Sequence, residues 1–250
     1  AGCIMGLIGE NGAGKSTTIR LILNALSRDG GTVAVYGKDN RALTPLERED
    51  IGAVLDEVGL PEYMTARQIG RMMAGIFARW QPEVYRDYLR RLALPEDKTF
   101  RDFSRGMKMK LGLAAALSHQ PKLLLLDEAT SGLDPVVRDE ILTIFADFTR
   151  DEEHAVLISS HIVSDLEKIC DYIAFLHKGR LLLCEEKDRL TEEYGILRGG
   201  TDGIAPAAVC GRHATPYGTE YLVRRDAVPV GMALGQVNIE DLFVFMAKEA

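Results

Sequence analysis

The sequence contains no long apolar run. Its apolar segments at 111–117 and 123–126 are far shorter than the roughly 18–20 apolar residues that a membrane-spanning helix needs. Internal repeats and low-complexity tracts are absent as well. Any role at a membrane is therefore expected to come through a partner.

Paired cysteines and an excess of positive charge are also missing. The four cysteines (Cys3, Cys170, Cys184 and Cys210) have no C-x-x-C spacing, so neither a zinc site nor a disulfide framework is predicted. A reduced, cytosolic compartment is the plain expectation. The 250 residues carry a formal net charge of −7, which argues against binding to nucleic acid by phosphate neutralisation. A hydrophobic share of 46% is enough for a sizeable core.

What the sequence does contain is a glycine-rich loop at 9–17, GENGAGKST, which fits the pattern G-x-x-x-x-G-K-[ST]. In this pattern backbone N–H groups surround nucleotide phosphates, the lysine reaches the β- and γ-phosphates, and the serine hydroxyl binds Mg²⁺. The flanking apolar residues predict a buried strand at 4–8 and a helix at about 19–26. The predicted nucleotide-binding residues are Gly9, Asn11, Gly12, Ala13, Gly14, Lys15, Ser16 and Thr17.

The remaining pattern predicts alternating strands and helices. Strands are predicted at 32–36, 51–55, 123–127 and 155–159, and a hairpin at 172–184 that turns at Lys178-Gly179. Helices are predicted at 65–94, 104–117, 136–150, 163–170 and 239–248. We expect the first of these to break near Trp80, the only tryptophan, and Trp80 to pack in a core.

Two carboxylates follow the apolar strand that ends near residue 126. Asp127 stands where ligands gather in open α/β sheets, so it is predicted to complete a Mg²⁺ site with Ser16. Glu128 is expected on the opposite face of the pleat, as the base that polarises an attacking water. The alternative is an acidic turn that leads into the helix after Asp134. The loop at 9–17 favours the catalytic interpretation.

Four further stretches resemble motifs of a known family. FSRGM at 103–107, LLLLDE at 123–128, ATSGLD at 129–134 and Ser160-His161 resemble the signature, Walker B, D-loop and switch histidine of ATP-binding cassette (ABC) ATPases. The resemblance covers about residues 2–190. It implies an α/β fold with a P-loop NTPase sheet in an ATPase domain at 1–190, a helical subdomain inserted at about 62–120, and a small α+β appendage at 191–250.

The resemblance also implies a head-to-tail dimer in which each ATP lies between one subunit's loop and the other subunit's signature. Ser104 and Gly106 would then present a hydroxyl and a bare amide at a helix N-terminus to the γ-phosphate. His161 would contact the same phosphate and couple it to Glu128, the catalytic base. Lys15, which would reach the β- and γ-phosphates, is the third predicted catalytic residue. Asp134 would bridge the dimer interface or cap the helix that follows it, and the two roles are compatible.

This sequence departs from the family pattern at three positions. Asp56 stands where cassette transporters usually carry a glutamine, and it is expected to bind Mg²⁺ through oxygen with more charge and a shorter reach. In the signature, Arg105 replaces a common glycine and Met107 a common glutamine. The aromatic residue that stacks on adenine in the family lies upstream of the loop, beyond this N-terminus. Because the first strand begins almost at once, we expect further residues to precede it.

The signature and the residues EDLF at 240–243 resemble single-cassette systems that export antibiotics, peptides or lipids. The implied protein binds ATP and Mg²⁺, hydrolyses ATP, pairs with an identical or paralogous ATP-binding subunit, and drives a separate transmembrane permease. It would lie on the cytoplasmic face of the cell membrane through that permease, without a nucleic-acid partner. The alternatives are a non-transport cassette ATPase and a regulatory module that binds ATP with little hydrolysis. The transported substrate and the role of the appendage, packing or ligand sensing, stay open.

Overall fold

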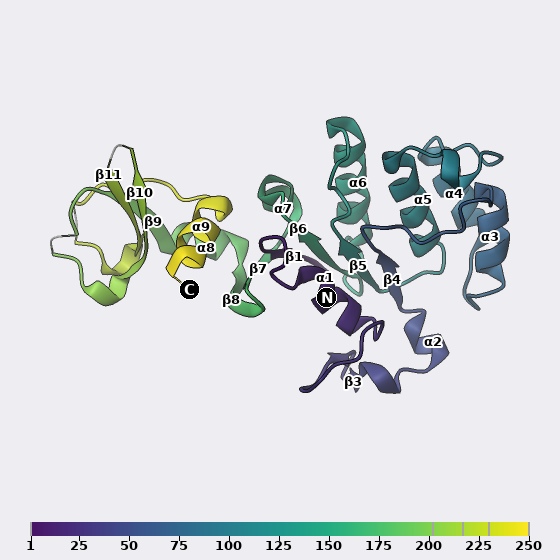
Figure 1. The fold of residues 1–250 in the computed structure, drawn as a ribbon, viewed down its shortest axis with the longest axis horizontal. Helices are drawn as coiled ribbons and strands as arrows, with labels where there is room; N and C mark the ends of the chain where they lie inside the picture. The colour runs from purple at the N-terminus through teal and green to yellow at the C-terminus, as the bar shows by residue number, and fades with distance from the viewer. Residues whose placement is uncertain (1, 202, 217, 230, 250) are drawn as a thin grey trace. The chain divides into compact units, whose positions relative to one another are not determined.

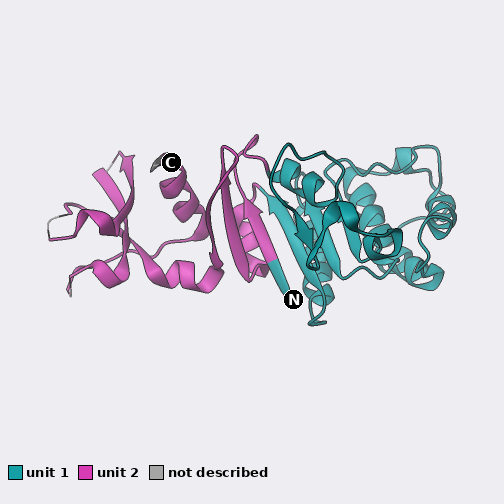
Figure 2. Cartoon of the chain, turned by 90° about the horizontal axis from the view of Figure 1, so that it is seen from below, with its two compact units in different colours: residues 1–4, 15–160 teal, residues 5–14, 161–250 magenta. Residues whose placement is uncertain are grey.

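The computed structural model describes residues 2–201, 203–216, 218–229 and 231–249. The chain divides into two compact units, coloured separately in Figure 2. The first comprises residues 1–4 and 15–160, and the second comprises residues 5–14 and 161–250. Strand β1 (Cys3–Ile8) therefore begins in the first unit and ends in the second.

The first unit contains three parallel strands in the order β4, β5 and β6 (Figure 1). Their bounds are Ile51–Val54, Leu123–Asp127 and Ala155–Ser160. In the central strand β5, Leu124, Leu125 and Leu126 have no exposed surface. Strands covered on both faces are apolar throughout, so the predicted strand at 123–127 is confirmed with its expected burial.

Helices of the first unit alternate with these strands. Their bounds are α1 Lys15–Ile22, α2 Pro45–Arg48, α3 Ala66–Ala74, α4 Pro82–Arg91, α5 Arg105–Leu117 and α6 Pro135–Phe148. Helix α1 packs on β5 and α5 packs on β4. The α/β alternation predicted from periodicity is confirmed in this unit.

The predicted helical stretch at 65–94 is two helices, α3 and α4, with the break near Trp80. Thr65 begins α3 with a capping box, and Pro82 occupies the first turn of α4 because its missing N–H would be unpaired there anyway. Trp80 is 8% exposed and its ring lies 5.1 Å from that of Tyr85. Its predicted core role is confirmed.

The strand predicted at 32–36 was too long. Only Ala34–Val35 forms β2, which pairs with β3 (Lys38–Asp39). The physical reason is a tight turn, since Tyr36 and Gly37 have positive φ angles of 51° and 77°.

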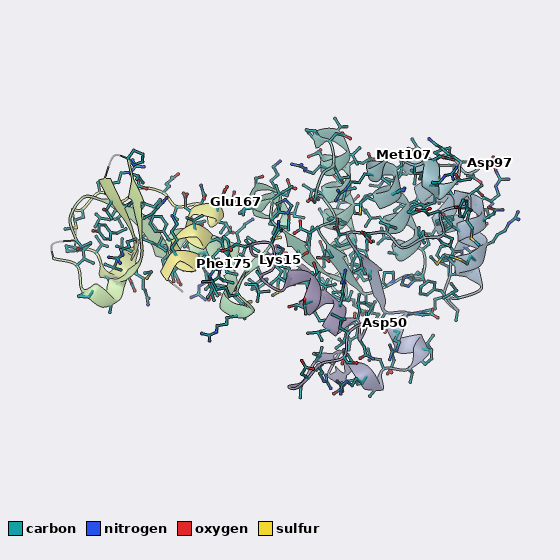
Figure 3. The ribbon with its side chains drawn as sticks, in the orientation of Figure 1. Lys15, Asp50, Asp97, Met107, Glu167 and Phe175 are labelled. Carbon is teal, nitrogen blue, oxygen red and sulfur yellow. The ribbon has the colours of Figure 1, made fainter. Side chains whose placement is uncertain are left out.

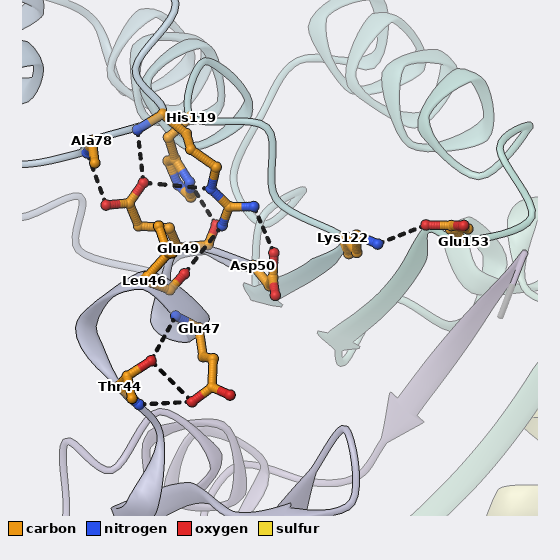
Figure 4. A network of polar contacts seen from close by, with 10 residues as sticks. Thr44, Leu46, Glu47, Glu49, Asp50, Ala78, His119, Lys122 and Glu153 are labelled. Atoms are coloured by element: carbon orange, nitrogen blue, oxygen red, sulfur yellow. Dashed lines mark hydrogen bonds and ion pairs between the residues drawn. The ribbon is translucent and has the colours of Figure 1, made fainter.

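A polar cluster ties the segment after α2 to the connection between α3 and α4 (Figure 4). The Glu49 carboxylate accepts hydrogen bonds from the N–H groups of Ala78 (2.8 Å) and Arg79 (2.9 Å). The Arg79 guanidinium donates to Asp50 Oδ1 at 2.7 Å. Buried His119, at the end of α5, lies 3.0 Å from the Glu49 carbonyl oxygen through Nδ1, and its burial lowers its pKa. The helical segment is therefore anchored by buried charge.

The second unit is built on β1, which pairs in parallel with β7 (Tyr172–His177), and β7 pairs antiparallel with β8 (Arg180–Glu186). Lys178 and Gly179 join β7 to β8 with φ angles of 46° and 76°, so the predicted hairpin is confirmed. Helix α7 (Val163–Ile169) precedes β7.

The C-terminal part of this unit contains helix α8 (Lys187–Glu193) and a three-stranded antiparallel sheet in the order β10, β11 and β9. The strands span Val209–Thr215, Gly218–Arg224 and Tyr194–Arg198. One cluster of buried residues comprises Leu197, Ile204, Ala208 and Val223. Short 3-10 turns occur in the chain at Asn40–Ala42, Phe100–Asp102, Pro206–Ala208 and Arg225–Ala227.

Helix α9 (Ile239–Glu249) closes the second unit and packs on β10 and α7. Glu167 of α7, labelled in Figure 3, accepts a hydrogen bond of 2.7 Å from the N–H of Ile239 and so caps the start of α9. Phe243 meets Phe175 of β7 edge to face at 5.4 Å. Within the described residues, no helix combines the length and apolarity that crossing a membrane requires.

Candidate functional site

The glycine-rich loop follows β1, and its residues 9–14 belong to the second unit. A Cβ atom at Gly9 would lie 2.4 Å from the carbonyl oxygen of Leu176, so only glycine fits there. Gly12 has φ +82° and no atom within 4 Å of its would-be Cβ. Ala13 accepts a hydrogen bond of 3.0 Å from the N–H of Gly179. The loop is thus held on its β7–β8 side and open at Gly12, a cradle suited to phosphate.

Lys15 is the first residue of α1 and lies in the first unit (Figure 3). Its side chain is 5% exposed, and Nζ lies 3.3 Å from Oε1 of Glu128. Helix N-termini carry partial positive charge, so the ammonium adds to a field that already favours anions. The structure therefore brings two of the three predicted catalytic residues together.

The sequence pattern predicts that Glu128 continues the pleat of β5, and this prediction is wrong. The strand ends at Asp127, and Glu128 has φ +53°, in the left-handed region that non-glycine residues rarely adopt. This backbone turn, and not strand alternation, aims the carboxylate at Lys15. Strained residues of this kind gather at functional sites.

Ser16 and Asp127, two of the three predicted magnesium ligands, are in contact. Ser16 Oγ donates to Oδ1 of Asp127 at 3.0 Å, and Asp127 is 1% exposed. A buried carboxylate beside a serine hydroxyl is an oxygen pair of the kind that Mg²⁺ takes, with water and phosphate oxygens to complete its shell. Among the described residues there is no group of three or more His, Cys, Asp or Glu that could hold a metal alone. The residues therefore fit a magnesium ion that arrives with a nucleotide.

Sequence reasoning missed Ser159, the residue of β6 paired in register with Asp127. Its hydroxyl donates to Oδ1 of Asp127 at 2.7 Å and accepts the N–H of Glu128 at 3.1 Å. One side chain thus fixes both carboxylate-bearing residues. The available signal was a serine at the end of an apolar strand, directly before Ser160-His161.

The third predicted magnesium ligand, Asp56, lies elsewhere. It follows β4 by two residues, its side chain is 52% exposed, and its Oδ1 lies 2.9 Å from Nη2 of Arg105. No contact described for it joins Asp56 to Ser16 or Asp127. Its role at the metal stays a prediction without geometric support here.

Ser104 and Gly106 lie at the start of α5, as predicted. Ser104 is the N-cap, and its Oγ accepts the N–H of Met107 at 3.3 Å. Gly106 approaches Val137, and a Cβ at Gly106 would lie 3.4 Å from Cγ1 of that residue. The phosphate contact of both residues stays a prediction.

Asp134 caps α6, because its Oδ1 accepts the N–H groups of Val136 (3.2 Å) and Val137 (3.1 Å). The capping interpretation is confirmed, whereas its place at a dimer interface stays a prediction. His161 directly follows β6, is exposed, and belongs to the second unit. Its coupling to Glu128 also stays a prediction.

The comparisons with known proteins agree with this geometry. The family model described as ABC transporter matches residues 1–131. The ABC transporter ATP-binding protein YtrB of Bacillus subtilis (strain 168) is 32% identical over 193 residues, 77% of this chain and 66% of YtrB. The bacitracin transport ATP-binding protein BcrA of Enterococcus faecalis is 32% identical over 250 residues, 96% of this chain and 79% of that protein. The chain thus spans slightly less than two thirds of YtrB.

A solved structure of an ATP binding subunit of an ABC transporter superposes with a TM-score of 0.68. It is 28% identical, and the match covers 76% of this chain and 81% of that one. In the first unit, the buried lysine and the Ser16–Asp127 pair, which follow the glycine-rich loop in sequence, are features of a nucleotide-binding protein of the P-loop class. Within that class, the chain belongs to the ABC transporter family of ATP-binding proteins.

Proposed function

We propose that this chain binds and hydrolyses ATP as the nucleotide-binding subunit of an ABC exporter and drives a separate membrane subunit through ATP-dependent dimerisation. The observation that carries the proposal is the contact between Lys15 and Glu128 beside the Ser16–Asp127–Ser159 cluster. A lysine for phosphate, a carboxylate for water and an oxygen pair for Mg²⁺ are the parts that phosphoryl transfer to water requires.

ATP binding exchanges partners at Lys15. The β- and γ-phosphates replace the Glu128 carboxylate as partners of the ammonium, and Glu128 is then available to accept a proton from the attacking water. Ser16 and Asp127 would hold Mg²⁺, which would neutralise the charge that develops on the phosphate. Ser159 keeps Asp127 in place through its 2.7 Å hydrogen bond.

The second half of each ATP site comes from another subunit. The first turn of α5, in which Ser104 caps the N–H of Met107, offers the N–H groups of Arg105 and Gly106 and the positive end of a helix dipole to a γ-phosphate. His161 and Asp134 complete the interface in this proposal. Binding of ATP closes the dimer and hydrolysis opens it, a two-state change that α3 and α4 transmit.

The permease is proposed to dock on a groove of the first unit that begins at Asp56. The residues that line the groove include three acidic ones (Asp56, Glu57 and Glu62), two basic ones (Arg105 and Lys108) and two aromatic ones (Phe100 and Phe103). The three carboxylates outnumber the two basic side chains, and the lining also contains aromatic rings, so it favours a basic, partly apolar segment of the membrane protein. Docking there would hold the chain at the cytoplasmic face of the membrane.

The cargo is proposed to be an antibiotic peptide, because a relative similar over 96% of this chain is named for bacitracin transport. The test is the growth of cells that carry the permease gene with either the unmodified chain or its Glu128→Gln variant. We expect the unmodified chain alone to raise resistance to bacitracin or a related peptide. Equal growth of the two strains in the presence of the peptide would exclude antibiotic peptides as the cargo.

The alternatives are a non-transport switch and a regulatory module. The acidic net charge of −7 disfavours a protein that works on ribosomes or DNA. The catalytic parts around Glu128 disfavour a module that binds ATP without turnover.

Two measurements test the proposal together. The first is the ATPase rate of the unmodified chain with Mg²⁺. The second is the solution mass of the Glu128→Gln variant with and without Mg²⁺-ATP. We expect steady turnover in the first and a dimer only with ATP in the second. Turnover without any ATP-dependent dimer would contradict the sandwich, and a dimer without turnover would favour the regulatory module.

A further inference from the structure

An ion pair in the first unit joins the segment after β4 to the start of α5. Arg105 Nη2 donates to Oδ1 of Asp56 at 2.9 Å, although 49 positions separate the two residues in sequence. Asp56 lies two residues after the end of β4, and Arg105 is the first residue of α5. The position of the Arg105 guanidinium is therefore coupled to Asp56.

Arg105 lies at the N-terminus of helix α5. It is the first residue of α5, directly after the cap Ser104 and before Gly106. The next residue, Met107, is labelled in Figure 3. In a helix the Cα–Cβ bonds tilt toward the N-terminus, so a side chain at the first position extends to the side where an anion meets the unpaired N–H groups.

A second contact limits where the guanidinium can lie. A Cβ at Gly132 would come within 3.2 Å of both Cζ and Nη1 of Arg105. Gly132 has φ +66° and belongs to the loop that joins Glu128 to Asp134. Arg105 therefore lies between the Asp56 carboxylate and the backbone of the loop that follows the catalytic base.

The ion pair is weak enough to exchange. The side chains of Arg105 and Asp56 are 55% and 52% exposed, and ion pairs in solvent contribute little to stability. A phosphate carries more charge than a carboxylate and accepts two parallel N–H groups from one arginine. Arg105 thus has a better partner available wherever a phosphate reaches this helix end.

We propose that Arg105 is a ligand of the γ-phosphate of ATP bound to a second subunit, and that Asp56 holds the guanidinium at the start of α5 until that phosphate arrives. The inference rests on the proposed function, because it needs the ATP sandwich. Asp56 is a competitor of the phosphate, since its carboxylate and the phosphate attract the same guanidinium and repel each other.

The test measures dimer formation in the hydrolysis-deficient Glu128→Gln background by sedimentation, as a function of Mg²⁺-ATP concentration. Arg105→Ala is expected to raise the midpoint concentration by about tenfold or more, because a charge-assisted bond to each phosphate is lost. Arg105→Lys keeps the positive charge but loses the planar guanidinium that can donate two parallel hydrogen bonds. Its midpoint should lie between those of the parent and Arg105→Ala.

Lys108→Ala is the matched control. It removes one positive charge from the same helix, but Lys108 lies over the ring of Phe100, 5.1 Å from its centroid, one turn beyond the helix start. We expect its midpoint to stay within about twofold of the parent, as for a screened surface charge. Equal shifts in Arg105→Ala and Lys108→Ala would mean that only net charge matters, and would overturn the proposal.

Asp56→Asn distinguishes a phosphate-binding role of Arg105 from a structural role, because the two roles predict opposite changes in the midpoint ATP concentration. If Arg105 binds phosphate, releasing it from Asp56 lowers the midpoint. If the ion pair merely braces α5, Asp56→Asn raises the midpoint as Arg105→Ala does, and the proposal is wrong. Absence of any ATP-dependent dimer in the Glu128→Gln parent would instead refute the proposed function. If the Glu128→Gln parent dimerises and Arg105→Ala leaves its midpoint unchanged, the role of Arg105 is refuted and the proposed function stands.

Discussion

The ammonium of Lys15 lies 3.3 Å from the carboxylate of Glu128, and both side chains are largely buried, at 5% and 13% exposure. A nucleotide phosphate must therefore compete with a protein carboxylate for the lysine. Glu128→Gln removes this competitor, so we expect the variant to bind ADP about three- to tenfold more tightly, in line with the loss of a partly buried ion pair. ADP is the suitable probe because it lacks the γ-phosphate that would close a dimer.

Glu153→Gln is the control for this titration, since it removes the same charge from an exposed ion pair with Lys122. Its ADP affinity should equal that of the parent. Lys15→Ala should bind ADP poorly in either background. Equal ADP affinity of Glu128→Gln and the parent would show that the carboxylate does not compete for the lysine.

Ser159 gives a second prediction, about magnesium. Its hydroxyl fixes Oδ1 of Asp127, and outer residues of this kind typically change metal affinity 10–100-fold when they are removed. Ser159→Ala should need about tenfold more Mg²⁺ for half-maximal ATP hydrolysis, with nearly unchanged binding of metal-free ADP.

The control for the magnesium titration is Ser118→Ala, which deletes another buried hydroxyl, one that donates to the carbonyl of Ala114 far along α5. If Ser118→Ala changes the magnesium requirement as much as Ser159→Ala does, the effect is general destabilisation and the assignment fails.

Alanine substitutions at Gly9 and Gly12, two glycines of the loop, should have different effects on stability. At Gly9 an added methyl group would lie 2.4 Å from a backbone oxygen, so Gly9→Ala should lower the free energy of unfolding by about 1–3 kcal/mol, as overpacking does. At Gly12 the methyl group meets open space, and the cost is mainly that of a positive φ, about 1 kcal/mol.

Nucleotide binding should rank the same two variants in the reverse order. We expect the methyl group of Gly12→Ala to occupy space that a phosphate needs, and so to weaken ADP binding more than its small effect on stability suggests. Urea denaturation and ADP titration of both variants check the ranking. A Gly12→Ala protein with normal ADP affinity would contradict the cradle.

The parts of the site that could be predicted from sequence are local. The loop at 9–17 and the Asp127-Glu128 pair lie within short stretches whose spacing reflects chemistry, and the strand at 123–127 reflects burial. Ser159 could not be predicted, because its role depends on the strand register that pairs it with Asp127, 32 positions away in sequence. The ion pair of Asp56 with Arg105 spans 49 positions and escaped for the same reason.

Other errors came from backbone conformation. Apolar alternation at 32–36 predicts a strand, but the turn at 36–37 limits β2 to two residues. The position of Glu128 follows from a positive φ at a non-glycine residue, which no propensity favours. In both places a turn of one or two residues overrides the periodic pattern, because it reverses or redirects the chain within a few ångströms.

The anchor around Glu49 predicts a pH dependence of stability. Burial alone would raise the pKa of this carboxyl, but the N–H groups of Ala78 and Arg79 and the charge of Arg79 outweigh it and hold the pKa below its usual value. A lowered folded-state pKa stabilises the fold above the unfolded-state value, about 4.3 for a glutamate, and this contribution disappears as the pH falls through the folded-state pKa. Glu49→Gln should therefore lose about 2 kcal/mol at pH 7, where one N–H is left unpaired.

The difference between Glu49→Gln and the parent should shrink as the pH falls below about 4.3, because protonation then neutralises the parent's carboxylate as well. Glu83→Gln, on the exposed face of α4, serves as the control and should match the parent at every pH. Urea denaturation between pH 3.5 and 7, followed by the fluorescence of Trp80 beside the anchored segment, measures the effect. A stability difference that stays constant over this range would mean that hydrogen-bond geometry, and not the charge of Glu49, holds the anchor together.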